Sequence, residues 1–212
     1  MQPLGIEYFI MKKYFVPYNT VRNDALKLAH KIYTEGFVPD VIYCSLRGGA
    51  YLANVISEYF KIVRKDSHPV YYAAVVARSY TDVRENSKVM VDGWTYSPEH
   101  LRHGDKILLV DDIFDTGNTI NSLVELLLEK GIPRKDIKVA VHDYKYFTYK
   151  KDQLPIQPDY WCNKIEITKP EDDIWIHYMS HELIGLSKEE LEQHYYNEDP
   201  ELRNVLEPLF SR

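Results

Sequence analysis

The sequence predicts an α/β fold, in which helices flank a central, mostly parallel sheet and the C-terminal third forms a small lobe. Helical and strand periodicities alternate from about residue 20 to about residue 142, as they do in β-α-β units. Residues 107–110, Ile-Leu-Leu-Val, are apolar on both sides, which is typical of a parallel strand that is covered on both faces. A chain of 212 residues can also bury a large core without a disulfide or a structural metal.

The first part of this alternation precedes residue 92. Apolar residues recur at helical spacing between residues 21 and 32, so a helix is expected there. Asn19 or Thr20 is its candidate N-cap, and Gly36 is its candidate stop. The elements expected next are a strand at 41–44, a helix at 50–60, a buried strand at 70–77 and a brief strand at 89–91.

The second part contains the clearest elements. After the strand at 107–110, apolar residues at 120, 123, 124, 127 and 128 follow the helical period, and Gly131 and Pro133 end that helix. Ile137, Val139 and Val141 alternate with other residues, which predicts a further strand.

The character of the sequence changes beyond Tyr144. Short strands are expected at 160–162 and 174–176, and Ser187 to Glu190 forms a capping box at the start of a short helix. We interpret residues 1–212 as a single domain with a core at about 19–143. The C-terminal lobe covers about 144–186, and residues 1–18 are a candidate addition to it.

Composition and charge exclude several classes of protein. Lys plus Arg total 26 and Asp plus Glu total 32, so the net charge is −6, which argues against binding of nucleic acid through its phosphate backbone. The two cysteines, Cys44 and Cys162, are too few for a disulfide framework. The N-terminus lacks a signal-peptide core, and no apolar run approaches the ~20 residues of a membrane span. We therefore expect a cytoplasmic protein without membrane contact.

The most informative stretch lies between the strand at 107–110 and the helix that follows it. Residues 115–119, Asp-Thr-Gly-Asn-Thr, place a glycine, two hydroxyls and an amide just before a helix N-terminus. Backbone N–H groups can converge there, and the helix dipole favours an anion. The absence of a following Gly-Lys-Ser/Thr distinguishes this phosphate cradle from a Walker A loop.

Two adjacent carboxylates, Asp111 and Asp112, directly precede the cradle. Such a pair repels phosphate alone, but it suits a ligand that also offers hydroxyls or a hard cation such as Mg²⁺. A phosphorylated sugar with vicinal hydroxyls and a metal-bridged diphosphate meets both requirements. Ribose with a 5′-phosphate and a 1′-diphosphate is the simplest such molecule.

This stretch resembles the phosphoribosyl pyrophosphate-binding signature of the type I phosphoribosyltransferases. Residues 107–119 match its pattern of four apolar residues, two acids, two apolar residues and Asp-Thr-Gly-x-Thr. The resemblance implies the type I phosphoribosyltransferase fold, with the C-terminal lobe as its hood. It also implies that Thr116, Gly117, Asn118 and Thr119 bind phosphoribosyl pyrophosphate together with Asp111, Asp112 and Asp115.

Two other segments resemble substrate-binding loops of the purine-salvage branch. Leu46-Arg47-Gly48-Gly49 is similar to the loop that grips pyrophosphate, where glycine lets the backbone approach the anion. Ser79-Tyr80 and the polar segment through Lys88 are similar to the mobile loop of hypoxanthine-guanine members, whose closure shields a cationic sugar from water.

The resemblance also implies how a purine would be bound. Lys145 matches the lysine that contacts the exocyclic oxygen of a 6-oxopurine. Trp175 and Ile176 match the residues that stack on the base and read its edge. Tyr160 and Trp161, after Pro158-Asp159, are rival stacking candidates. The usual Pro-Trp after this strand is missing, so Glu182 is only a candidate for the acid that holds a second Mg²⁺.

The resemblance therefore predicts a Mg²⁺-dependent phosphoribosyltransferase of purine salvage, with Asp111, Asp112 and Asp115 as its catalytic residues. Asp115 is the expected general base, and a homodimer or homotetramer is expected. Hypoxanthine, guanine and xanthine are not ranked. The alternative is a regulator of the same fold that senses phosphoribosyl pyrophosphate or nucleotide and binds nucleic acid. A diphosphokinase is disfavoured by chain length, and a zinc site at His177, His181 and Cys162 lacks a usual ligand set.

Overall fold

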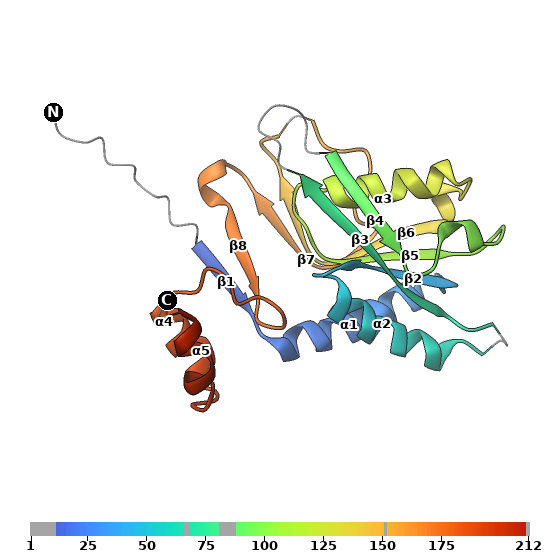
Figure 1. The fold of residues 1–212 in the computed structure, drawn as a ribbon. Coiled ribbons are helices and arrows are strands. Elements are labelled where there is room, and N and C mark those ends of the chain that lie inside the picture. Colours follow the sequence, from blue (N-terminus) through green and yellow to red (C-terminus); the bar gives the residue numbers. More distant parts are fainter. Residues whose placement is uncertain (1–11, 66–67, 81–87, 151, 211–212) are drawn as a thin grey trace. The chain divides into compact units, whose positions relative to one another are not determined.

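The computed structural model describes residues 12–65, 68–80, 88–150 and 152–210. The chain forms two compact units, Met1–Ser180 and His181–Arg212. The first unit contains a six-stranded sheet and a two-stranded sheet (Figure 1). The predicted α/β fold with a mostly parallel central sheet is confirmed.

The six-stranded sheet has the order β4-β3-β2-β5-β6-β7. Every neighbouring pair is parallel except β3 and β4, which are antiparallel. Its strands are β2 (Val41–Leu46), β3 (Tyr71–Tyr80), β4 (Lys88–Trp94), β5 (Ile107–Phe114), β6 (Ile137–Phe147) and β7 (Tyr160–Ile167).

Helices cover both faces of this sheet (Figure 1). On one face α1 (Tyr18–Thr34) and α2 (Ala50–Val63) pack against apolar residues of β2, β5 and β6. On the other face α3 (Asn118–Glu129) packs against the alternate residues of the same strands. Strand connections run in opposite directions from β2 and from β5, so right-handed crossovers place α2 and α3 on opposite faces.

Strand β7 differs from its predicted place in the lobe, because it is the sixth strand of the main sheet. The small sheet instead pairs β1 (Lys12–Val16) with β8 (Ile174–Tyr178), in parallel and in the register Phe15↔His177. Strand periodicity at residues 160–162 gave no information on which sheet they join, since pairing is a tertiary property.

Several element boundaries also differ from the prediction; β5 and β6, for example, continue to Phe114 and Phe147. Helix α1 begins at Tyr18 after Pro17, so Asn19 and Thr20 lie inside its first turn and neither is the N-cap. Proline's fixed φ suits a helix start, which explains why the helix begins earlier than the capping preference suggested. Strand β3 continues through Tyr80 because β4 pairs with it up to Lys88.

The second unit is helical. It contains α4 (Lys188–Leu191), a π-helical turn (Glu192–Tyr196) and α5 (Leu202–Phe210). The predicted capping box is confirmed: the Glu190 N–H donates to Ser187 Oγ, and the Ser187 N–H donates to Glu190 Oε2. Within the described ranges, no helix combines the length and the apolar character that crossing a membrane requires.

We predict that Gly117→Ala destabilises the protein more than Gly131→Ala does. Gly117 has a φ of 80° and Gly131 a φ of 85°. At either position alanine should therefore lower the stability of the protein by about 1–2 kcal/mol. A Cβ at Gly117 would also collide with the Phe114 ring, whereas Gly131 has open space. Overpacking should add about 1–3 kcal/mol at Gly117.

Urea unfolding of the two variants measures this difference. Gly131→Ala is the matched control, because it lies at the other end of α3 and has the same backbone conformation. Equal losses of unfolding free energy would contradict the role given to the Phe114 contact.

Candidate active site

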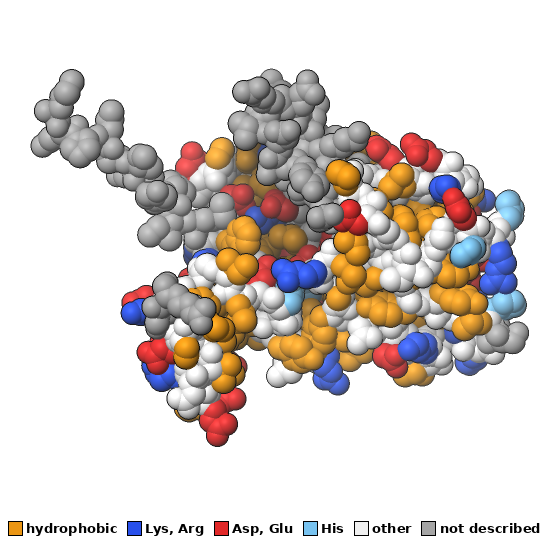
Figure 2. All heavy atoms as spheres, viewed as in Figure 1, with side chains coloured by type: hydrophobic (Ala, Val, Ile, Leu, Met, Phe, Trp, Pro, Cys, Tyr) orange, Lys and Arg blue, Asp and Glu red, His pale blue; other side chains and the backbone are white. Residues whose placement is uncertain are grey.

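The candidate site lies where β2 and β5, two adjacent parallel strands, end. The chain leaves β2 through residues 47–49 into α2, and it leaves β5 through residues 115–117 into α3. Because the two crossovers diverge here, this is the topological switch point at which open α/β sheets bind ligands. In the view of Figure 2, acidic and basic side chains gather around a hollow beside the main sheet.

The acid pair consists of Asp111 and Asp112 and lies within β5, which continues through both residues. The backbone N–H of Asp112 donates to Asp111 Oδ1 (3.1 Å), and that of Ile113 donates to Asp112 Oδ1 (2.9 Å). These local bonds fix both carboxyl groups at the end of the strand.

The loop after β2 lies directly against the acid pair. A Cβ at Gly48 would overlap the carboxyl group of Asp112, and one at Gly49 would meet the carbonyl of Val110. Any larger residue would therefore separate the two strand ends. Arg47 is exposed beside this contact, and the peptide bond between Leu46 and Arg47 is cis.

The ionised form of Asp111 is electrostatically unfavourable beside Asp112. Burial raises the pKa of Asp111 well above its ordinary value, and the neighbouring charge of Asp112 raises it further. The Ser45 hydroxyl acts in the opposite direction. Such a pair would be relieved by a cation or by hydroxyl donors, since either would stabilise the ionised form.

The predicted phosphate cradle follows the acid pair. Asp115 and Thr116 are exposed, and Gly117 takes a left-handed conformation that leads into α3. The helix begins at Asn118 and has no acidic residue in its first turn. Its N-terminal N–H groups and dipole therefore favour an anion beside Thr116 and Thr119.

Asn121 supports this cradle and was missed by the sequence analysis. Its buried side chain donates to the carbonyls of Gly117 (3.0 Å) and Ile156 (2.9 Å), and it accepts from the Ile156 N–H (3.0 Å). The signal available in the sequence was an amide next to the apolar positions of the predicted helix, because an amide that becomes buried needs hydrogen-bond partners.

Lys145 joins the cradle to the hood side of the site. Its side chain is 4 % exposed, and its ammonium lies 2.8 Å from Asp173 Oδ1 and 3.8 Å from Asp115 Oδ1. The Asp115 side chain is 46 % exposed, but the protein around it still desolvates the carboxyl group and raises its pKa, although Lys145 opposes the shift. The sequence analysis also missed Asp173, because its ion pair with Lys145 depends on how β8 packs.

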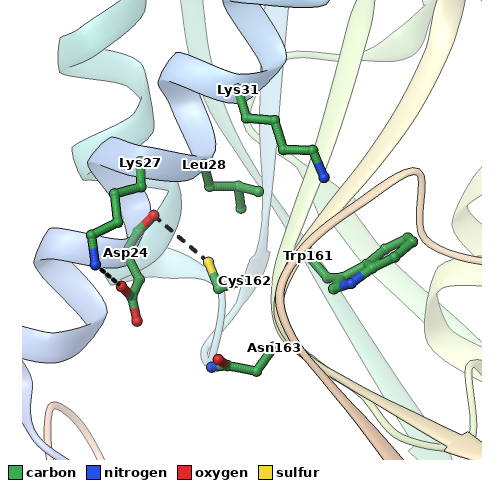
Figure 3. A pocket seen from close by; sticks show the side chains of 7 residues that line it. All are labelled: Asp24, Lys27, Leu28, Lys31, Trp161, Cys162 and Asn163. Atoms are coloured by element: carbon green, nitrogen blue, oxygen red, sulfur yellow. Dashed lines mark hydrogen bonds and ion pairs between the residues drawn. The ribbon is translucent and has the colours of Figure 1, made fainter.

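The candidate base-binding residues lie on β8. Trp175 is 50 % exposed and Ile176 is buried, so Trp175 lies partly at the surface while the next residue anchors the strand. Tyr160, the rival candidate, is 5 % exposed within the core. Trp161 lines a different pocket, of about 340 Å³, beside Lys27, Lys31 and Cys162 (Figure 3). This placement favours Trp175 over both rivals as the stacking residue.

The remaining predicted site residues have less structural context. Ser79 and Tyr80, which were expected in a mobile loop, belong to β3 and pair with Val89 and Lys88. The other residues of the expected loop, 81–87, lie outside the described residues. Glu182 belongs to the second unit, where its carbonyl accepts from the Tyr195 hydroxyl (3.1 Å). Its role as a metal ligand stays a prediction.

Metal binding can be assessed from the donor groups. No group of three or more His, Cys, Asp or Glu side chains in the described part of the chain could hold a metal ion, which gives the zinc alternative no support. Mg²⁺ needs fewer protein ligands, because it is often held by one or two carboxylates together with substrate phosphates. The hard oxygen donors of Asp111 and Asp112 fit that requirement.

The fold and site define an α/β protein with an acid pair and a predicted phosphate cradle at the switch point of its sheet. Residues 18–177 match the family model described as the phosphoribosyl transferase domain. The chain therefore belongs to the phosphoribosyl transferase domain family.

The curated relatives that match this chain include proteins named PyrR and proteins named hypoxanthine-guanine phosphoribosyltransferase. It is 25 % identical over 164 residues to the bifunctional protein PyrR of Halalkalibacterium halodurans, covering 76 % of this chain and 88 % of the relative. It is 27 % identical over 134 residues to the hypoxanthine-guanine phosphoribosyltransferase of Canis lupus familiaris, covering 61 % of this chain and 60 % of that protein. The match thus spans about three fifths of the canine relative's length.

Solved structures share the fold. A purine phosphoribosyltransferase from Pyrococcus horikoshii has a TM-score of 0.62 at 21 % identity, over 84 % of this chain and 99 % of that one. A hypoxanthine phosphoribosyltransferase from Staphylococcus aureus has a TM-score of 0.56 at 18 % identity, over 78 % and 83 % of the two chains.

We predict that Asp111→Asn raises the thermal midpoint near pH 7. The raised pKa of Asp111 means that its stabilising contribution is complete below 3.8, the ordinary value, and is lost as the pH rises through the raised pKa. Asparagine retains the shape of the side chain but carries no charge, so this loss of stability with rising pH is removed. Each kcal/mol gained corresponds to about 2–4 °C for a chain of this size.

Calorimetry between pH 4 and pH 8 tests this prediction, with exposed Asp152→Asn as the control. The gain of Asp111→Asn should shrink toward pH 4. A midpoint that falls at pH 7, or a gain independent of pH, would be inconsistent with a disfavoured carboxylate at this position.

Proposed function

We propose that the protein transfers the 5-phosphoribosyl group from phosphoribosyl pyrophosphate to a 6-oxopurine, with Mg²⁺, and releases pyrophosphate and a nucleoside monophosphate. One observation carries the proposal: Gly48 contacts the carboxyl group of Asp112, so the loop after β2 and the acid pair before the cradle form one site. The coarser activity follows from the family, and the purine and the metal are the parts proposed.

Each part of phosphoribosyl pyrophosphate has a partner in this arrangement. The N–H groups at the start of α3 and the hydroxyls of Thr116 and Thr119 suit the 5′-phosphate. The acid pair can accept hydrogen bonds from the ribose hydroxyls. The residues 46–48 offer backbone groups and the Arg47 guanidinium to the diphosphate.

The reaction forms a bond between a purine nitrogen and ribose C1 and breaks the bond between C1 and the diphosphate oxygen, whose electron pair leaves with pyrophosphate. The purine nitrogen loses a proton, and Asp115 is the proposed acceptor. Its raised pKa suits a general base better than an ordinary aspartate pKa does. The acid pair stabilises positive charge on the ribose ring. Mg²⁺, when bound, would neutralise charge on the diphosphate.

Recognition of the base is assigned to Lys145 and β8. The buried Lys145 ammonium is a localised donor for the exocyclic oxygen of a 6-oxopurine. The exposed Trp175 ring can stack on the purine, which contributes about 1–3 kcal/mol in comparable sites. The relatives named as hypoxanthine-guanine phosphoribosyltransferases and the solved purine phosphoribosyltransferases support this choice.

A second candidate is a regulator that senses phosphoribosyl pyrophosphate or nucleotide and binds nucleic acid. Matches to relatives named bifunctional favour a second activity. The net charge of −6 gives little support to binding of a phosphate backbone. An electrophoretic mobility shift with RNA and DNA, with and without phosphoribosyl pyrophosphate, separates this candidate from the first.

Activity assays with separate bases test the proposed function. The protein is incubated with phosphoribosyl pyrophosphate, Mg²⁺ and hypoxanthine, guanine, xanthine, adenine, orotate or uracil in turn, and nucleotide formation is followed by absorbance. We expect turnover with at least one 6-oxopurine and its loss when EDTA removes the metal. Turnover only with orotate, uracil or adenine would refute the proposed base class.

We predict that Asp115→Asn lowers kcat by about 100-fold or more and weakens phosphoribosyl pyrophosphate binding far less. The substitution removes the proton acceptor and leaves the cradle and the acid pair in place. Steady-state kinetics and isothermal titration calorimetry measure the two effects. Asp152→Asn, an exposed aspartate outside the site, is the control, and unimpaired turnover of Asp115→Asn would remove the assignment.

A further inference from the structure

A buried polar cluster lies behind the acid pair and takes no part in the proposed chemistry. Its centre is Asp143 of β6, which is 1 % exposed. The Asp143 carboxylate faces three groups: Nδ1 of His142 at 2.6 Å, the hydroxyl of Tyr178 at 2.6 Å and the amide of Asn163 at 3.2 Å. A carboxylate so deeply buried is held in one orientation by such partners.

The cluster reaches the acid pair through Tyr178. This β8 side chain is 1 % exposed, and its hydroxyl lies 2.6 Å from Asp143 Oδ2 and 3.0 Å from the backbone carbonyl oxygen of Asp112. The single phenolic proton is therefore shared between a carboxylate and the acid pair's own backbone. Burial, with the charges of Asp143 and Asp112, raises the pKa of Tyr178 well above its ordinary value, so the hydroxyl stays a donor.

This arrangement joins three strands at one oxygen atom. Tyr178 belongs to β8, Asp143 to β6 and Asp112 to β5, and β5 and β6 pair at Ile113↔Asp143. The side chain of Asp112 in turn rests on Gly48. A shift of the Asp112 carbonyl would thus move the carboxyl group against the loop after β2.

The outer side of the cluster faces α1, where Nε2 of the buried His142 has no hydrogen-bond partner among the described residues. Nε2 of His142 lies 3.5 Å from Asp24 Oδ2. Asp24 and Asn163 both line the pocket between α1 and β7 (Figure 3). The cluster therefore extends from that pocket to the backbone of the acid pair.

We propose that Tyr178 is a positioning residue for the acid pair: its hydroxyl, oriented by Asp143, fixes the backbone of Asp112 and thereby the carboxylates that face the ligand. The effect on phosphoribosyl pyrophosphate rests on the proposed function. The effect on the backbone of Asp112 does not. Tyr178 touches no reacting atom, so its loss should change binding more than the rate of the bound substrate.

The test compares Tyr178→Phe with Tyr43→Phe. Tyr43 is a matched control, because it is equally buried and its hydroxyl donates to a backbone carbonyl, that of Tyr96, at 2.9 Å. Tyr43→Phe loses one hydrogen bond to a backbone carbonyl, whereas Tyr178→Phe loses such a bond and also the bond to the Asp143 carboxylate, so its thermal midpoint should fall further. A merely structural role would make the two variants alike in every other measurement.

Two measurements separate positioning from stability. Hydrogen–deuterium exchange reports the backbone amides of residues 112–114, which should exchange faster in Tyr178→Phe and remain as in the wild type in Tyr43→Phe. Kinetics with phosphoribosyl pyrophosphate and Mg²⁺ should show KM raised about 10–100-fold in Tyr178→Phe, with kcat changed less. Asp143→Asn, which keeps the side-chain shape, should show the same two changes and serves if Tyr178→Phe does not fold.

The outcomes distinguish the two proposals. Unchanged exchange at residues 112–114, or identical KM values in Tyr178→Phe and Tyr43→Phe, would overturn the role of Tyr178. If the wild-type protein neither binds phosphoribosyl pyrophosphate nor transfers its sugar, the proposed function fails. In that case hydrogen–deuterium exchange at residues 112–114 alone tests whether Tyr178 fixes the backbone of Asp112.

Discussion

The close contact between the backbone at Gly48 and the carboxyl group of Asp112 is the constraint on which the site depends. It requires a residue without a side chain after β2 and a polar group at the end of β5, on adjacent parallel strands. Because crossovers leave these strands toward opposite sides of the sheet, their ends stay uncovered. The loop after β2, the acid pair and the N-terminus of α3 can therefore contact one ligand.

The ionised forms of Asp111 and Asp115 are electrostatically unfavourable in this site. Asp111 is desolvated beside Asp112, and Asp115 is desolvated beside Asp173, so burial raises the pKa of both Asp111 and Asp115. The charge of Lys145 opposes the rise in the pKa of Asp115, and the Ser45 hydroxyl opposes the rise in the pKa of Asp111. Carboxylates with raised pKa values are typical of functional sites. The structure thus combines a rigid scaffold with an acid pair that a cation-bearing sugar phosphate would stabilise.

Much of the fold was predictable because its elements depend on local patterns. The apolar run of β5 and the helical period of α3 indicated a strand, a turn and a helix in the correct order, and the capping box at Ser187 followed from two side chains three residues apart. The sheet assignment of β7 was not predictable, since residues 160–162 carry strand periodicity but no mark of their neighbour. The start of α1 was misplaced because Pro17 outweighed the capping preference of Asn19 and Thr20.

The sequence alone determined the chemistry of the strand-loop-helix segment at residues 107–119, because those residues are neighbours along the chain and their roles depend on local backbone geometry. Only the tertiary structure decided which distant groups meet there: Gly48 against Asp112, Asp173 against Lys145, and Tyr178 between Asp143 and the Asp112 carbonyl. Such long-range contacts depend on strand order, register and side-chain packing, which a pattern along one segment does not encode.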